Sequence, residues 1–381
     1  MKHVNRFPKC ALLMLAIALS VTFSAAETPQ PSQRPVGPGN VFVQPALGGT
    51  IFGFDIDQNG TEGLLSESTG CAYATETFDL ATGKIIKIVR EGHPSNCADD
   101  DVTWGITGTS VGLVEHQHEP DFGDLQMSFQ LLDPLEGNQF TAPWTPPGKG
   151  TAYIWGASRN QSTPINAYQV YDIHTTLMYV YGSDVAGNKF GPVTQIASYP
   201  GIVGLNSKTN TAIVFASNGQ PYGPSYVNQI DLASGKVTTF LGLGSGTVQG
   251  VAVDAADNIL VTTTYGDAGV EFYNLTTHTA FEDILPNCFS PACSGFDVAF
   301  DPINKLFLVA QPISSLGVGE ISAIYVYDTQ GNLIEELIGF NFYTQRFDVF
   351  PVHIALHPSD RSGFVDVTNS TGVGSIQSFT Y

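Results

Sequence analysis

Residues 250–264 read Gly-Val-Ala-Val-Asp-Ala-Ala-Asp-Asn-Ile-Leu-Val-Thr-Thr-Thr, and residues 270–280 continue with Val-Glu-Phe-Tyr-Asn-Leu-Thr-Thr-His-Thr-Ala. Short runs of apolar and β-branched residues, separated by turn-forming residues, are typical of β-strands. Asp254–Asn258 contains residues that accept turn geometry, so it should close the first hairpin. The two stretches together predict four short strands joined up and down.

The turn of the second hairpin recurs along the chain. Phe78–Ile85 reads Phe-Asp-Leu-Ala-Thr-Gly-Lys-Ile, and Ile230–Val237 reads Ile-Asp-Leu-Ala-Ser-Gly-Lys-Val. Looser copies begin at Leu132, Tyr171, Tyr273 and Tyr327. An Asp or Asn side chain can accept hydrogen bonds from turn amides, and Gly adopts positive φ without a steric penalty. The recurrence predicts a conserved type of turn between the third and fourth strands of each unit.

The units repeat with a period of about 49 residues, a spacing typical of β-propeller blades. First strands should begin near residues 51, 102, 151, 202, 250, 296 and 353. We therefore expect an all-β propeller of seven four-stranded blades, with six as the alternative because the third unit is hard to delimit. The last unit, which ends in 375–381, lacks a fourth strand. Asn40–Gln44 could supply that strand and close the ring.

The first 26 residues resemble a secretory signal peptide. Lys2, Arg6 and Lys9 precede an apolar run over residues 11–21, and Ser24-Ala-Ala26 fits a cleavage site. Residues 27–39 are rich in Pro and Gly and predict an extended leader. Residues 40–381 should then form a single propeller domain. The run is too short to stay in a membrane as a helix, so we expect no transmembrane segment and a secreted or periplasmic protein.

The chain is strongly acidic, with 35 Asp and Glu against 15 Lys and Arg and a net charge of −20. Such a surface should be repelled by nucleic acids and by anionic membranes. Four cysteines follow the signal peptide, and export would favour their oxidation. We expect the bridges Cys71–Cys97 and Cys288–Cys293, with a cysteine zinc site as the alternative.

Long loops should gather on one face of the propeller. This upper face is the one on which second strands connect to third strands and each blade connects to the next. Long loops on a rigid scaffold commonly form binding sites, and exposed aromatic rings suit sugars, peptides or proteins. Arginines there could bind a carboxylate. The predicted ligand-binding residues are Trp144, Arg159, Tyr222, Tyr226, Phe342, Tyr343 and Arg346.

A metal site is a further hypothesis for this face. On an extended segment His116 and His118 would point the same way, and Glu119 and Asp121 could complete a site for Zn²⁺ or Cu²⁺. Asp99–Asp101 offers only oxygen ligands, which suit Ca²⁺. The alternative is that these are ordinary polar loop residues. The only cofactor we consider is therefore a divalent metal, Ca or Zn.

The pattern Gly250-Val-Ala-Val-Asp with Asn258-Ile-Leu-Val261 resembles the NHL and YVTN repeats of YncE-like propellers, and Val298–Val309 is similar to it. The resemblance implies the fold more than a function. Gluconolactonase-like propellers bind a central metal with residues at first-strand entrances. The corresponding positions here, Gln249, Phe296 and Val352, form a poor ligand set.

These observations favour a secreted binding protein over an enzyme. We expect a protein, peptide or glycan to bind the upper face, with its identity and the oligomeric state left open. The alternative is a metal-dependent lactonase or other hydrolase of the gluconolactonase-like type, which would need three or more ligands at the channel mouth.

Overall fold

The fold was determined from a computed structural model, in which the described residues of the propeller belong to one compact unit, Ser32–Tyr381. The structure describes residues 32–35, 41–57, 59–92, 99–107, 111–118, 126–133, 139–140, 152–157, 165–172, 177–184, 187–197, 202–217, 225–242, 247–265, 269–284, 297–312, 322–340, 353–369 and 371–381.

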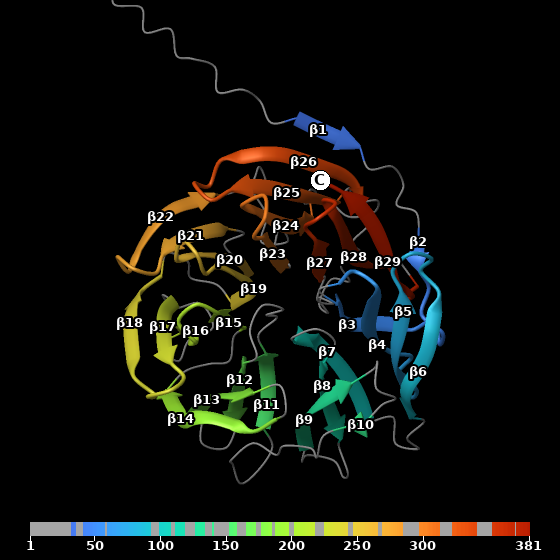
Figure 1. Cartoon of the computed structure of the whole chain (residues 1–381), viewed down its shortest axis with the longest axis horizontal. Coiled ribbons are helices and arrows are strands. Elements are labelled where there is room, and N and C mark those ends of the chain that lie inside the picture. Colours follow the sequence, from blue (N-terminus) through green and yellow to red (C-terminus); the bar gives the residue numbers. More distant parts are fainter. Residues whose placement is uncertain are drawn as a thin grey trace, which may run out of the picture. The chain divides into compact units, whose positions relative to one another are not determined.

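The strands form seven sheets arranged as blades around a common centre (Figure 1), which confirms the all-β propeller and its seven blades. The first strand of each blade lies nearest the centre, and the second, third and fourth follow outward. Observed first strands begin at residues 50, 99, 152, 203, 247, 297 and 354, all within three residues of the predicted starts.

Each blade is an antiparallel sheet in which consecutive strands are neighbours. Blade 1 consists of β3 (Thr50–Ile56), β4 (Glu62–Ser68), β5 (Tyr73–Asp79) and β6 (Ile85–Gly92). Blade 2 consists of β7 (Asp99–Thr107), β8 (Val111–His118), β9 (Gln126–Asp133) and β10 (Gln139–Phe140). Blade 3 consists of β11 (Ala152–Ala157), β12 (Ile165–Asp172), β13 (Leu177–Asp184) and β14 (Lys189–Ala197). Blade 4 consists of β15 (Val203–Asn206), β16 (Thr211–Ser217), β17 (Ser225–Asp231) and β18 (Val237–Leu241).

The remaining three blades follow the same plan. Blade 5 consists of β19 (Thr247–Asp254), β20 (Ile259–Tyr265), β21 (Val270–Asn274) and β22 (Thr279–Ile284). Blade 6 consists of β23 (Asp297–Asp301), β24 (Leu306–Pro312), β25 (Ser322–Asp328) and β26 (Leu333–Phe340). Blade 7 consists of β27 (Ile354–His357), β28 (Ser362–Thr368), β29 (Gly374–Thr380) and, from the N-terminal region, β2 (Val41–Val43).

The N-terminal strand closes the ring as expected. β2 pairs with β29 antiparallel, with Val41 opposite Gln377 and Val43 opposite Ile376. An additional strand, β1 (Ser32–Pro35), falls within the stretch predicted as a leader and pairs in parallel with β26 at the outer edge of blade 6. Blade 6 therefore has five strands.

The hydrophobic core is divided among the interfaces between blades. Between blades 5 and 6, for example, Val261 and Phe272 pack with Phe307, Val309 and Tyr327. Alternate residues of a strand face opposite sides of the sheet. Both faces of the inner strands are therefore covered, which explains their nearly continuous apolar sequences.

The predicted turns are formed largely as expected. Asp79 Oδ1 accepts the amide of Thr82 at 2.7 Å, and Asp231 Oδ1 accepts that of Ser234 at 2.8 Å. Gly83 and Gly235 follow with φ of 68° and 73°, the region that glycine enters without penalty.

One detail differs from expectation. The turn after Asp172 joins the second and third strands of blade 3, β12 and β13, and not the third and fourth. The third-to-fourth turn of that blade begins at Asp184, which accepts hydrogen bonds from Asn188. The difference arises because local sequence does not reveal which strand a turn leaves.

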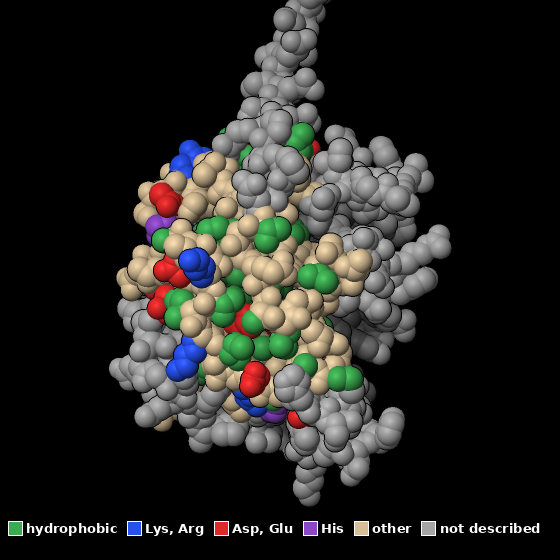
Figure 2. Space-filling model, turned by 90° about the vertical axis from the view of Figure 1, so that its right-hand side faces the viewer, with side chains coloured by type: hydrophobic (Ala, Val, Ile, Leu, Met, Phe, Trp, Pro, Cys, Tyr) green, Lys and Arg blue, Asp and Glu red, His purple; other side chains and the backbone are tan. Residues whose placement is uncertain are grey.

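The outer strand β6 lies on the side of the molecule shown in Figure 2, where hydrophobic side chains are interspersed with charged ones. Ile86 and Ile88 are exposed there, and Lys87 and Arg90 lie on the same strand. Cations on an edge strand discourage pairing with other chains. Within the described ranges, the structure contains no helix long and apolar enough to span a membrane.

Candidate binding site

A pocket of about 490 Å³ lies at the centre of the ring, among the ends of the first strands and the turns that follow them. We call it the mouth pocket. Five blades contribute to it: blade 1 through Asp55 and Asp57, and blades 4 to 7 through residues 203–207, 251–256, 298–305 and 354–358. Because first-to-second turns lie opposite the upper face, the pocket opens on the face of short turns.

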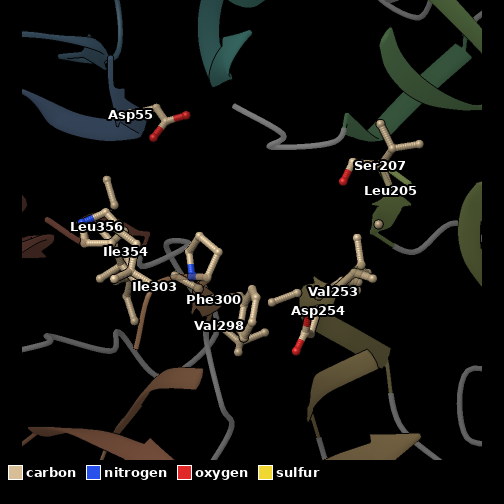
Figure 3. A pocket seen from close by; sticks show the side chains of 18 of the residues that line it. Asp55, Leu205, Ser207, Val253, Asp254, Val298, Phe300, Ile303, Ile354 and Leu356 are labelled. Carbon is tan, nitrogen blue, oxygen red and sulfur yellow. The ribbon is translucent and has the colours of Figure 1, made fainter. Parts of the chain in front are cut away.

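The walls of the mouth pocket are mostly apolar. Figure 3 shows their side chains surrounding an open centre, with Asp55 on one side and Leu205 and Ser207 across from it. The larger apolar residues of the lining are Val203, Leu205, Val251, Val253, Val298, Phe300, Pro302, Ile303, Ile354, Leu356 and Pro358. Ile303 is 65% exposed, the highest value among the large hydrophobic residues that the structure describes as exposed. An apolar group could therefore bury surface here.

Lys305 is the one lysine or arginine among the described residues that line the pocket. Its Nζ lies 3.0 Å from Asp254 Oδ2 and 3.2 Å from Asp257 Oδ2, and the charge stands 5.6 Å above the ring of Phe300. Partial burial lowers the pKa of Lys305, but the hydrogen bonds and charges of the two carboxylates outweigh it and raise the pKa above its usual value. The lysine stays cationic at neutral pH and joins blade 6 to blade 5.

The carboxylates of the lining are also engaged within the protein. Asp254, only 1% exposed, accepts the amide of Ala256 at 3.0 Å in addition to Lys305. Asp57 accepts the amide and hydroxyl of Thr61, both at 2.7 Å. Asp55 accepts the amide of Ile106, in blade 2, at 2.8 Å. These groups hold turns and blades together, which leaves the apolar walls as the surface offered to a ligand.

The closing blade meets blade 1 beside the pocket. His357 Nδ1 lies 3.0 Å from Asp360 Oδ1, and Nε2 lies 3.3 Å from Ser359 Oγ. Gly60, with φ of 65°, packs so closely that a Cβ on it would lie 2.2 Å from His357 Nε2. Glycine suits this position, because a side chain would clash with the imidazole and the positive φ is one that glycine adopts without penalty.

Neighbouring turns are linked to one another around the rim. Asn206 Nδ2 donates to Asn258 Oδ1 at 3.0 Å, joining blade 4 to blade 5. Asn304 Nδ2 donates to the carbonyl of Pro358 at 3.4 Å, joining blade 6 to blade 7. With the Lys305 ion pairs, these bonds connect four consecutive blades. The pocket is therefore a preformed feature of the ring.

Two of the predicted metal residues, His116 and Asp101, meet at the interface of blades 1 and 2. His116 Nδ1 lies 2.9 Å from Asp101 Oδ1, directly across strands β8 and β7. Asp101 is fully buried, and its Oδ2 also accepts the hydroxyl of Thr75 at 2.8 Å and lies 3.5 Å from Arg90 Nε. Arg90 in turn donates to Gln130 Oε1 at 2.6 Å. This polar network joins the two blades.

No group of three or more His, Cys, Asp or Glu arranged to hold a metal ion occurs in the part of the chain that the structure describes. Asp99 and His118 are paired backbone positions of β7 and β8. Glu119 and Asp121 lie outside the described residues, and the metal site stays a prediction.

Most of the predicted upper-face residues also lie outside the described residues: Trp144, Arg159, Tyr222, Phe342, Tyr343 and Arg346. Tyr226, in β17, is half-buried and pairs with Ala216 and Leu241. Of the cysteines, Cys97, Cys288 and Cys293 are likewise outside this part of the chain, so both pairings with their partners, including Cys71, stay predictions.

Sequence reasoning missed the mouth pocket, although a signal for it exists. Turns at 206–210, 254–258, 301–305 and 357–361 share a five-residue length and end in a residue with φ between 53° and 58°. The regular spacing of these turns predicts that they gather on one face. Their apolar residues, such as Ile303, then indicate an opening there.

No protein-family model and no curated protein matches this chain. Solved structures share its fold. A chain of "Crystal Structure of Mitotic Checkpoint Complex" is 11% identical with a TM-score of 0.59, over 90% of this chain and 92% of that one. The chain of "Structure of U3-55K" is 10% identical with a TM-score of 0.61, over 91% and 100%. At these identities the likeness shows the fold alone.

Proposed function

We propose that this protein is an exported interaction propeller, and that its mouth pocket receives an apolar side chain presented by a protein partner. The observation that carries the proposal is the pocket itself: a preformed cavity of about 490 Å³ whose walls are apolar. Ligand pockets commonly measure about 300–1,000 Å³ and combine apolar walls with a few polar groups. Propellers commonly act as interaction scaffolds, and one structural neighbour belongs to a multiprotein complex.

The charges near the opening favour a partner with basic residues beside its apolar anchor. The hydrogen bond and charge of Lys305 lower the pKa of Asp257. At Asp360, burial raises the pKa, but hydrogen bonds from Ser362 and His357 lower it below the usual value. Both carboxylates are therefore ionised at neutral pH. With the net charge of −20, they would attract cationic segments at long range.

Export is supported by the signal-peptide pattern of residues 1–26, and the expected location is extracytoplasmic. The repeat pattern around Gly250 and Val298 supports a relationship to NHL and YVTN propellers, because both segments form the same strand–turn–strand unit in blades 5 and 6. The upper-face residues and the two disulfides remain part of the proposal as predictions from sequence.

The proposal can be tested with a displayed library of random peptides selected on the mature protein. Peptides that use the pocket should contain an apolar residue near a Lys or Arg. Their affinity should fall at least tenfold for Ile303→Asp. The matched control is Ile86→Asp, which changes an isoleucine that is 51% exposed on the outer strand β6. Equal affinity for both variants, or no enriched peptide, would refute the use of the mouth pocket.

A further inference from the structure

Residues 44–49 connect the closing strand β2 of blade 7 to β3 of blade 1, and we call them the closing segment. The segment also holds the start of β29. The carbonyl of Gly49 accepts the amide of Gly374 at 2.7 Å, and Gln44 Nε2 donates to the carbonyl of Gly374 at 3.2 Å. Because blade-to-blade connections lie on the upper face, the closing segment lies at the opposite end of the ring from the mouth pocket.

Two buried glutamates accept the amides of the closing segment. Glu67, on β4, accepts the amide of Leu47 at 2.7 Å with one oxygen and that of Gly49 at 2.8 Å with the other. Glu76, on β5, receives only the amide of Ala46, at 3.3 and 3.2 Å from its two oxygens. Both glutamate side chains are fully buried. Since hydrogen bonds from amides stabilise a carboxylate, the shorter and more numerous bonds favour the negative charge on Glu67.

The two glutamates hold one proton between them. Glu76 and Glu67 are hydrogen-bonded to each other, and a bond between two carboxyl groups requires a proton on one of them. Within the described residues, neither carboxyl forms an ion pair with Lys, Arg or His. Burial, and next the charge of Glu67, raise the pKa of Glu76 from 4.5 to about 7. Glu76 is therefore the protonated partner and donates to Glu67.

The other titratable groups around this pair offer no cation to a second charge. On blade 7, Asp366 faces blade 1, because its neighbours along β28 pack toward blade 6, and it is paired with His353 at 2.9 Å. On β6, Glu91 is exposed and lies on the same face of the sheet as Glu76. Asp55 of β3 is bonded to an amide of blade 2. β29 and the closing segment contain no titratable side chain.

We propose that the closing segment is a pH-controlled latch, which loosens and uncovers the start of β29 when Glu76 loses its proton. Two adjacent carboxylates repel each other, and a buried charge is costly unless it is paired or hydrated. Water reaches Glu76 once the segment moves away. Opening of the latch therefore releases the proton, and a higher pH favours the open form. This latch does not depend on the function proposed for the mouth pocket.

The pH range of the latch follows from the two states of Glu76. The carboxyl has a pKa of about 7 in the closed form, and in the hydrated open form it returns to the usual 4.5. Below about pH 4.5 both forms are protonated, and the closed form has its full stability. Between these values only the closed form keeps the proton, so the fraction of open molecules rises by up to about tenfold per pH unit. Above about pH 7 both forms are ionised, and opening levels off.

Hydrogen exchange of the whole mature protein tests the latch, with Glu76→Gln as the matched variant. Glutamine has the shape of a protonated carboxyl group and can donate in its place, but it does not titrate. We expect exchange at the amides of Leu47 and Gly49, corrected for the intrinsic effect of pH, to rise at least about tenfold from pH 5 to pH 7 in the wild type. In the variant it should stay constant. The amide of Gly235, which is bonded in a turn of blade 4, should not change in either protein.

Circular dichroism at both pH values verifies that the two proteins are folded. An equal rise in wild type and variant, or no rise in the wild type, would overturn the proposal, because Glu76 would then not control the segment. A rise of the same size at Gly235 would also overturn it, since the whole ring would then open. An infrared spectrum of the wild type is independent of the variant: a protonated-carboxyl band should be present at pH 6, and its absence would contradict the shared proton.

Discussion

The interface between blades 1 and 2 and the mouth pocket use charged residues differently. At the interface, Asp101 is buried and joined to His116, Thr75 and Arg90, so the charges connect two blades. At the pocket, charges such as Asp254 and Lys305 hold the rim together, and apolar walls face the cavity. In both regions the ionisable residues stabilise the ring. What distinguishes the pocket is the apolar surface that the rim leaves open.

His116 and Asp101 show how polar residues can serve the fold. Each belongs to a separate candidate metal site in the sequence, and metal binding by either site stays a prediction. The structure pairs them with each other, and the surrounding hydroxyls and Arg90 complete a hydrogen-bonded network. The pocket, by contrast, is built from turns whose sequences look unremarkable in isolation.

The largest loss of stability should come from a substitution in the apolar interface between blades 5 and 6. Phe272 is fully buried and its ring contacts those of Phe307 and Tyr327. Phe272→Ala should lower the free energy of unfolding by about 4 kcal/mol through lost burial and a new cavity. Urea denaturation measures it, with Phe281→Ala as control because Phe281 is 41% exposed. Equal losses for the two variants would mean that this interface is not the core.

The polar interface between blades 1 and 2 should be nearly as sensitive to substitution. Asp101→Ala removes the common partner of three groups, and leaving buried polar groups unpaired costs about 3 kcal/mol. Asp257→Ala is the control, because that carboxylate is 58% exposed and its loss should cost little. A loss below about 1 kcal/mol for Asp101→Ala, by the same denaturation measurement, would show that the network does not hold the blades together.

The stability of the protein should depend on pH through a second polar cluster, which lies next to the segment between β2 and β3. Glu76 and Glu67 are both fully buried, and they accept amides of Ala46, Leu47 and Gly49, in the segment that joins β2 to β3. Burial, and next the charge of Glu67, raise the pKa of Glu76 from 4.5 to about 7. Its folded form therefore holds a proton that the unfolded chain releases at lower pH.

It follows that the contribution of Glu76 to stability is fully present below about pH 4.5 and falls as the pH rises to about 7. The free energy of unfolding of the wild type, relative to Glu76→Gln, should decline by an amount on the order of 2 kcal/mol over this window. Urea titrations at several pH values measure it. A difference that stays constant with pH would mean that Glu76 does not titrate in this range.

The smallest effect concerns the rim turns. Asn210 has φ of 53°, a region that most residues with a Cβ avoid but that Gly and, to a lesser degree, Asn adopt. Asn210→Ala should therefore destabilise the protein by about 1 kcal/mol, whereas Asn210→Gly should be close to neutral. Thermal melting of the two variants compares them directly. A larger loss for glycine than for alanine would contradict the turn geometry.

Much of the fold was predictable because it rests on local patterns. Alternation of strands and turns gave the starts of the first strands, and the missing fourth strand of the last blade pointed to Val41–Val43. Asp79 and Asp231 took up the expected turn bonds. Such features depend on residues close in sequence, which is why they can be inferred without a structure.

The sites were harder to predict because they depend on distant residues. Asp254 and Lys305 are 51 residues apart, and only the packing of blade 5 against blade 6 brings them together. The strand Ser32–Pro35 was hidden by the prolines around it, since these suggested an extended leader. Its pairing depends on an edge about 300 residues away, which no local pattern in the leader reveals.

The most direct test of the mouth pocket is hydrogen exchange of the mature protein with and without one selected peptide. We predict that amides slow in the first-to-second turns around the pocket, 203–207, 251–256, 298–305 and 354–358. The third-to-fourth turns at 79–84 and 231–236, which lie on the same face but farther from the centre, should remain unchanged. Protection of those outer turns alone, or of the upper face alone, would contradict the account.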